Sequence, residues 1–218
     1  MKKCLFTCCL LIISWVAKSQ ILVSGGTTGI GNYSTLSAAI NALNTGGALT
    51  APVFVDIPAG YTETLSSKVI LTMTGTAANT ITIQKSGSGA NPLFTSYVGT
   101  VATPSVIADG FFVIAGGDYI TIDGIDLQES SSNTTTTTVM EFGFGLFKAS
   151  PTDGAQYNTI KNCTITLNRV QNGNWTSPGH TGSIGITVNN GLYTATGVVT
   201  VTAASGSNSF NKFYSNTS

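Results

Sequence analysis

The amino-acid sequence predicts an all-β fold: a parallel β-helix with one short α-helix near its start. Apolar and polar residues alternate along most of the chain after residue 50, which is the pattern of half-buried strands. Charged residues make up only 8% of the sequence, against about 25% in a typical globular domain. The alternation also slips by one residue at recurring places, and this slip indicates the fold.

The slip is clearest in the stretch GDYITIDGIDLQES. Ile122 and Ile125 are three residues apart, whereas the apolar residues on either side of this step are two apart. A flat strand that slipped by one residue would turn its next apolar residues to the wrong face. We therefore expect the chain to bend at Asp123-Gly124, so that two successive strands face different sides.

The same three-residue step recurs between Ile160 and Cys163 and near Phe213. Aligning the steps stacks Ile122, Ile160 and Phe213 in one column and places Gly124, Asn162 and Ser215 at the corner. Glycine and asparagine accept the left-handed backbone conformation that a sharp bend needs. The corners are 38 and 53 residues apart (124 to 162 and 162 to 215), which suits one coil per repeat with loops of variable length.

Two alternatives to a parallel β-helix fit the sequence less well. A sandwich of antiparallel hairpins does not explain a repeated slip at glycine and asparagine. Disorder conflicts with 42% hydrophobic residues in regular alternation.

The first 19 residues are predicted to be a signal peptide. A short basic start precedes the apolar run Cys4–Val16, and Ala17-Lys18-Ser19 has small residues at the two positions that a signal peptidase reads. The apolar run is shorter than the roughly 20 residues needed to span a bilayer. We therefore expect an exported protein, secreted or at the outer cell surface, with residues 20–218 forming one domain.

Removal of this segment leaves Cys163 alone among the four cysteines, so the mature chain has no internal disulfide. Loss of Lys2, Lys3 and Lys18 lowers the basic residues from 9 to 6, against 9 acidic ones. This balance leaves no basic surface for nucleic acid.

One segment has helical periodicity, NYSTLSAAINALNTGG, which begins at Asn32. Its apolar stripe consists of Leu36, Ala39, Ile40 and Leu43. Asn32 or Ser34 is the expected N-cap, and Gly46-Gly47 is the expected stop. The remaining segments with strand patterns are Pro52–Ile57, Lys68–Met73, Asn79–Gln84, Gly110–Gly116, Tyr119–Gln128, Phe142–Ala149, Asn158–Asn168, Gly182–Val188 and Gly197–Ala204.

The stretches GNYSTLSAAINAL, PVFVDIPAGYTETL and NTITIQKSGSG resemble the opening of right-handed parallel β-helix proteins of the pectate-lyase-like superfamily. In that superfamily a short helix plugs the N-terminal end. GGDYITIDGIDLQ and DGAQYNTIKNCTITLN resemble coils of large bacterial surface proteins with this fold, many of which are exported by type IX secretion. The resemblance covers nearly all of the mature chain, but its motifs specify a fold more than an activity.

A lyase of this superfamily needs calcium held by carboxylates and a basic residue to take the substrate proton. The candidates for calcium are Asp118, Asp123 and Asp126. However, the predicted register places Asp123 beside Lys161 in one outward column with Gln84 and Tyr214, where a solvent-side ion pair is the simpler interpretation. Hydrolases of this fold use closely spaced aspartates, and this chain has no adjacent pair.

Aromatic and polar groups remain as candidate ligand contacts. The loop NGNWTSPGHTG carries Trp175 and His180, and Tyr214 lies on the outward column. Sugars stack on such rings and form hydrogen bonds with neighbouring polar side chains. We expect a non-enzymatic surface, adhesion or structural module whose partner is a polysaccharide or cell-surface glycan. The alternative is a polysaccharide lyase or glycoside hydrolase whose catalytic residues lie in coils beyond Ser218, because the last coil, Asn211–Ser218, stops early and predicts a longer reading frame.

Overall fold

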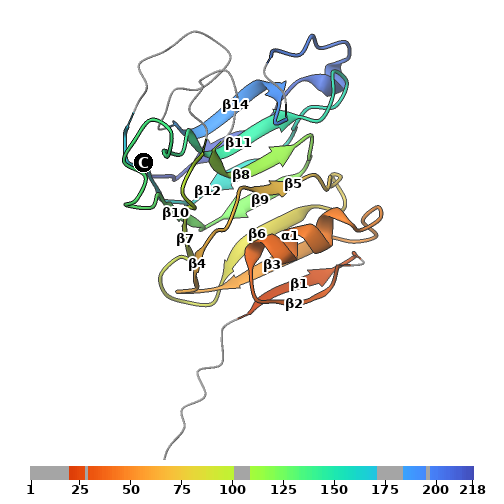
Figure 1. Cartoon of the computed structure of the whole chain (residues 1–218). Coiled ribbons are helices and arrows are strands. Elements are labelled where there is room, and N and C mark those ends of the chain that lie inside the picture. Colours follow the sequence, from red (N-terminus) through yellow and green to blue (C-terminus); the bar gives the residue numbers. More distant parts are fainter. Residues whose placement is uncertain (1–19, 28, 101–108, 171–183, 195–196) are drawn as a thin grey trace, which may run out of the picture.

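The computed structural model describes residues 20–27, 29–100, 109–170, 184–194 and 197–218. The predicted signal peptide therefore lies outside the described residues, as do Trp175 and His180. Three sheets run side by side along the molecule, and the chain winds through them coil by coil (Figure 1). The fold is a parallel β-helix with one short helix near its N-terminus.

The sheets are named here A, B and C. Sheet A contains β15 (Lys212–Tyr214), β12 (Thr159–Lys161), β9 (Ile120–Asp123), β6 (Ile81–Ser86), β3 (Val53–Pro58), β1 (Ile21–Gly25) and β2 (Gly31–Tyr33), in that spatial order. Sheet B contains β13 (Ile165–Thr166), β10 (Asp126–Gln128), β7 (Leu93–Thr95) and β4 (Thr62–Thr64). Sheet C contains β14 (Ile184–Leu192), β11 (Phe142–Lys148), β8 (Gly110–Ala115) and β5 (Val69–Leu71).

Neighbouring strands are parallel within all three sheets, except that β1 pairs antiparallel with both β2 and β3. The register agrees with the alignment of the slips, since Ile160 pairs with Ile122 on one side and with Phe213 on the other. Ile122 and Ile160 are fully buried. The inward residues of successive coils therefore stack into one continuous core.

The corner between sheets A and B is formed by left-handed residues. Gly124, Asn162 and Ser215 have φ values of 68°, 57° and 55°. Each follows the end of its sheet A strand by one residue. The phase slip in the sequence is therefore the point at which the chain turns from one sheet to the next.

Helix α1 (Leu36–Asn44) buries the predicted stripe of Leu36, Ala39, Ile40 and Leu43. Its N-cap is Thr35, whose side chain accepts a hydrogen bond from the Ala38 N–H, so the prediction of Asn32 or Ser34 is wrong. Thr35 directly precedes the first helical residue, and from there its hydroxyl reaches the N–H of the third helical residue, Ala38. The described residues include no helix that is long and apolar enough to cross a membrane.

The helix also closes one end of the stack. The Asn44 amide donates to the Ile70 carbonyl at 2.7 Å and accepts from the Thr72 N–H at 2.8 Å, so it bonds the backbone at the outer edge of β5. On the neighbouring sheet, Glu63 Oε2 accepts the Leu36 N–H at 2.8 Å, which places a carboxylate at the start of the helix. Side chains thus satisfy backbone groups that an uncovered edge would leave open.

Some predicted elements differ from the structure. The described residues of Gly197–Ala204 form no strand apart from a bridge between Val198 and Gly191, and Val198 is 67% exposed. Contact with β14 is limited to this bridge and to the Val199 N–H, which donates to the Asn190 carbonyl at 2.8 Å, so no strand forms in these described residues. The short strands β1, β2, β4 and β7 were not predicted from the sequence. A strand of three to five residues has too few inward-facing residues to show the alternation of apolar and polar side chains.

Candidate functional site

The outward face of sheet A presents two columns of side chains. One column consists of Asp56, Gln84, Asp123, Lys161 and Tyr214. The other consists of Phe54, Thr82, Thr121, Thr159 and Lys212. Because neighbouring strands lie about 4.8 Å apart, each column repeats its side chains at that spacing along the coil axis.

The threonine column offers free hydroxyl groups. Thr82, Thr121 and Thr159 are half-buried and stand in register on three consecutive strands. Within the described part of the chain, none of their hydroxyls has a hydrogen-bond partner. Phe54, 39% exposed, lies at one end of this column, and the exposed Lys212 lies at the other. The column therefore combines hydrogen-bonding groups with an apolar ring, which is the usual composition of a sugar-binding surface.

The charged column is internally paired. Gln84 Nε2 donates to Asp56 Oδ1 at 2.8 Å. Lys161 Nζ lies 3.0 Å from Asp123 Oδ2, and the hydrogen bond and charge of Asp123 raise the pKa of Lys161. This half-exposed pair is the solvent-side ion pair expected from the sequence, a type that contributes little to stability.

The three predicted calcium ligands point to different partners. Asp123 Oδ1 accepts the Asn162 side-chain amide at 2.6 Å. Asp126, on β10 of sheet B, accepts the Asn91 amide at 2.9 Å and the Thr164 N–H at 2.8 Å. The described residues contain no group of three or more His, Cys, Asp or Glu side chains placed to hold a metal ion.

Asp118 lies at the corner that precedes β9. Its Oδ1 accepts the Gln156 N–H at 2.7 Å, and its N–H donates to Thr74 Oγ1 at 3.1 Å. Burial raises the pKa of Asp118 to about 6, partly opposed by the bond from Gln156, while the nearby Asp153 adds to the increase. These bonds link three coils, which gives Asp118 a structural role at this corner.

An aromatic ladder borders sheet A at the same corner. Tyr119, Tyr157 and Phe210 stack in consecutive coils, with ring centroids 4.7 Å apart at each step. Tyr157 is 42% exposed and Phe210 is 65% exposed. The predicted ligand contact Tyr214 is 49% exposed at the end of the charged column, one strand position beyond Phe213.

A buried acidic network lies where the loops between sheets B and C meet. Asp109 and Glu141 are 3% and 6% exposed, and the Asp109 N–H donates to Glu141 Oε2 at 2.9 Å. Asp109 also accepts the Thr100 N–H at 2.8 Å and the Tyr97 hydroxyl at 3.3 Å. Burial and the charge of Asp109 raise the pKa of Glu141 to about 8, partly opposed by Lys68.

This network was not predicted, because only the pairing of β8 with β11 brings Asp109 and Glu141 next to each other. Its carboxylates bond backbone N–H groups of adjoining segments and are almost inaccessible. Strongly shifted pKa values are typical of active sites, but buried structural networks produce them as well. The outward face of sheet A, which is accessible, is therefore the stronger candidate for a binding site.

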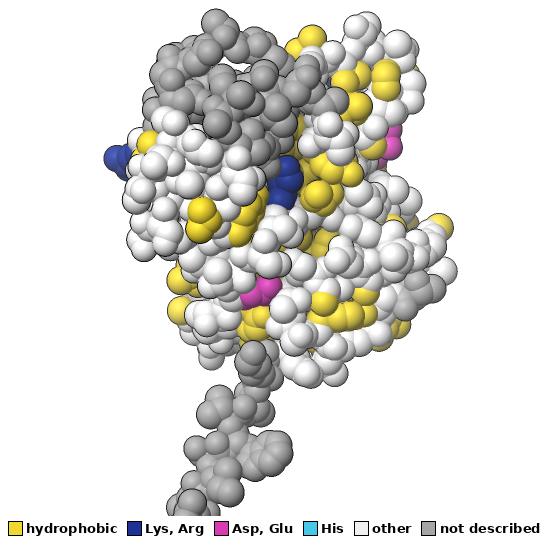
Figure 2. Space-filling model, viewed as in Figure 1, with side chains coloured by type: hydrophobic (Ala, Val, Ile, Leu, Met, Phe, Trp, Pro, Cys, Tyr) yellow, Lys and Arg dark blue, Asp and Glu magenta, His cyan; other side chains and the backbone are white. Residues whose placement is uncertain are grey.

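The face of the molecule that Figure 2 draws carries few charged groups. Figure 2 shows one face on which uncharged polar atoms and small apolar patches predominate, with isolated charged groups. Comparisons with family models, with curated proteins and with solved structures found no match to this chain.

Proposed function

We propose that the protein is a non-enzymatic β-helix module of the cell surface or the secreted fraction, which binds a glycan along the outward face of sheet A. The observation that carries this proposal is the threonine column, whose three hydroxyls stand in register with no protein partner among the described residues. Free hydroxyls at a regular spacing suit a ligand that itself repeats hydroxyl groups along its length.

The neighbouring groups support the same ligand class. Phe54 supplies an apolar surface at one end of the threonine column. Gln84, Asp123 and Lys161 form a parallel row of polar groups beside it. Sugars require this mixture, because their ring faces are apolar while their hydroxyls need oriented hydrogen bonds.

The predicted export signal and the resemblance to β-helix surface proteins of the pectate-lyase-like superfamily support an extracellular role in this proposal. We include in the proposal that the chain belongs to this superfamily and is exported by the type IX route. Both rest on sequence features alone, namely residues 1–19 and the motifs GGDYITIDGIDLQ and DGAQYNTIKNCTITLN.

The test is binding of the chain to a panel of neutral and acidic polysaccharides, measured by affinity electrophoresis and titration calorimetry. Thr121→Val removes the central hydroxyl with little change in shape, so we expect binding to weaken about five- to tenfold, as for loss of one or two hydrogen bonds. Thr64→Val, at an exposed position on β4 of sheet B, is the matched control and should have no effect.

Two outcomes would overturn the proposal. Equal affinities of the Thr121→Val and unmodified proteins would show that the threonine column is not the binding surface. Release of reducing or unsaturated sugars, assayed with and without calcium, would show that the protein is a lyase or a hydrolase instead.

A further inference from the structure

The aromatic ladder brings two tyrosine rings into contact. Tyr119 and Tyr157 lie with their ring planes 8° from parallel and their centroids 4.7 Å apart. They stand at equivalent positions of consecutive coils, each two residues before the paired Thr121 and Thr159. The ring carbons next to the two phenol oxygens are therefore held close together as well. No other pair of tyrosine rings is in contact in the described part of the chain.

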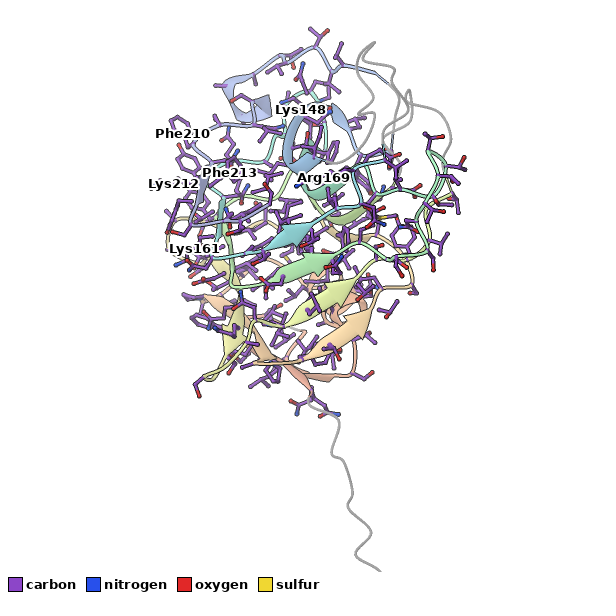
Figure 3. The ribbon with its side chains drawn as sticks, turned by 90° about the vertical axis from the view of Figure 1, so that its left-hand side faces the viewer. Lys148, Lys161, Arg169, Phe210, Lys212 and Phe213 are labelled. Atoms are coloured by element: carbon purple, nitrogen blue, oxygen red, sulfur yellow. The ribbon has the colours of Figure 1, made fainter. Side chains whose placement is uncertain are left out.

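The stack does not need the two phenol hydroxyls. Phe210, which has none, occupies the third position of the ladder at the same 4.7 Å from its neighbour Tyr157. Figure 3 shows Phe210 at the outer edge of the molecule. Among the described residues, neither the Tyr119 nor the Tyr157 hydroxyl has a hydrogen-bond partner. Both hydroxyls are therefore free for chemistry.

The other described tyrosines lack this combination of a free hydroxyl and a tyrosine neighbour. The hydroxyls of Tyr33, Tyr61 and Tyr97 donate to protein oxygen atoms at 2.9, 2.9 and 3.3 Å. Tyr193 is half-buried and Tyr214 is 49% exposed, but neither contacts another tyrosine ring among the described residues. Within this part of the chain, the ladder alone places two free phenols side by side.

The pair is accessible to a dissolved oxidant. Tyr157 is 42% exposed and Tyr119 is half-buried. Both residues lie outside the strands, at the corner where their φ values are 56° and 52°. Side chains at exposed positions exchange rotamers rapidly, so the two rings can turn their edges toward each other while β9 and β12 stay paired.

A bond between the two rings would join neighbouring coils directly, because equivalent positions of successive coils are about 4.8 Å apart. A disulfide cannot do so among the described residues, where Cys163 is the single cysteine and is 1% exposed. We propose that Tyr119 and Tyr157 form an oxidative cross-linking site, at which a dityrosine bond fastens two consecutive coils. This inference does not depend on glycan binding.

The oxidant is a peroxide acting through a haem peroxidase. Each phenol loses one electron and its hydroxyl proton, and the two electrons and two protons reduce one hydrogen peroxide to two water molecules. The two phenoxyl radicals then couple through the carbons next to their oxygens, which forms one carbon–carbon bond. The hydrogens on these carbons move to the oxygens and restore both phenols, so the chain loses two hydrogen atoms in total.

The test treats the dilute, folded chain with a haem peroxidase and hydrogen peroxide. We expect dityrosine fluorescence, a monomeric product lighter by two hydrogen atoms, and a cross-linked peptide pair that contains Tyr119 and Tyr157. Tyr157→Phe keeps the ring contact but removes one phenol, so the yield should fall at least about tenfold, because no second phenol is held nearby. Tyr214→Phe removes an exposed phenol outside the ladder and is the matched control, which should not change the yield.

The cross-link should also raise the urea midpoint of unfolding, because it closes a loop of 38 residues (119 to 157) in the unfolded chain. Peroxidase-treated Tyr157→Phe is the reference for this comparison, so that oxidation elsewhere in the chain is matched. The proposal is overturned if no intramolecular product forms, if Tyr214→Phe lowers the yield as much as Tyr157→Phe, or if the midpoint does not rise. A covalent dimer as the main product would overturn it in favour of coupling between chains.

Discussion

The rings of Tyr119 and Tyr157 lie 4.7 Å apart, with their planes 8° from parallel. Tyr157 stacks in the same way on Phe210. All three residues have left-handed backbones, with φ of 52°, 56° and 61°. The ring separation matches the spacing of the coils, so the left-handed turn at this corner repeats from coil to coil and directs each ring onto the next.

Tyr157 is the central ring of this ladder, and its loss should therefore remove two stacking contacts. We expect Tyr157→Ala to lower the free energy of unfolding by roughly 1–3 kcal/mol, as measured by chemical denaturation. Tyr157→Phe keeps both stacks and should be nearly neutral. If the phenylalanine variant were as unstable as the alanine variant, the hydroxyl rather than the stack would be responsible.

The corner at Asn162 makes a second prediction about the backbone. Its φ of 57° disfavours β-branched residues, so Asn162→Val should cost roughly 1–3 kcal/mol of unfolding free energy. Asn162→Gly should be close to neutral, because relief of the left-handed strain offsets the lost hydrogen bond to Asp123. Equal stability of the valine and glycine variants in urea would argue against strain at this corner.

The coil register could be predicted because it depends on local features that recur. The slip between Ile122 and Ile125 returns at Ile160, and its positions correspond to the observed pairing of Ile122 with Ile160. The helical stripe from Leu36 to Leu43 was likewise visible as a period. These features require only the alternation of apolar residues and the preference of glycine and asparagine for sharp bends.

The site could be predicted less well, because it depends on contacts between coils. The outward column of Asp123, Lys161 and Tyr214 followed from the register. The meeting of Asp109 with Glu141 was missed, although both residues directly precede sheet C strands that pair with Phe142 opposite Gly110, because no slip marks the alignment of β8 with β11 in the sequence. The aromatic ladder was also missed, although 119, 157 and 210 are separated by the same 38 and 53 residues as the corners.

The buried Glu141 makes stability depend on pH. Its pKa of about 8 in the folded protein lies above the ordinary value of 4.5, so the folded state binds this proton more tightly than the unfolded state does. The free energy of unfolding should therefore decrease as the pH rises from about 4.5 through 8, by roughly 3–5 kcal/mol in total. Asp118 contributes in the same direction up to about pH 6, so the change between pH 6 and 8 is the part to compare with a variant of Glu141.

The comparison is Glu141→Gln, which cannot ionise and should make the unfolding free energy nearly flat between pH 6 and 8 in urea titrations. It should also be more stable than the unmodified protein at pH 9. A slope between pH 6 and 8 that persists in the glutamine variant would assign the effect to another group.

The last prediction concerns Cys163, whose side chain accepts an N–H of the preceding coil where the following coil uses the side chain of Asn216. The Cys163 Sγ accepts the Ile125 N–H at 3.5 Å. One coil further along, Asn216 Oδ1 accepts the Cys163 N–H in the same way, at 3.1 Å. Asn216 also donates to the Ile160 carbonyl at 2.9 Å. Sulfur is a weak acceptor, so the bond from Ile125 to Cys163 is weaker than the bond from Cys163 to Asn216.

Cys163→Asn should therefore raise the free energy of unfolding by roughly 0.5–1.5 kcal/mol, because an amide oxygen replaces the sulfur at a buried N–H. Cys163→Ala should lower it by roughly 1–3 kcal/mol, because the Ile125 N–H loses its acceptor in a site that is 1% exposed. Both are measured by urea unfolding, with hydrogen exchange of the Ile125 amide as the local readout. Faster exchange at Ile125 in the asparagine variant than in the alanine variant would show that the side-chain amide does not reach this N–H, and that the cysteine is retained for packing alone.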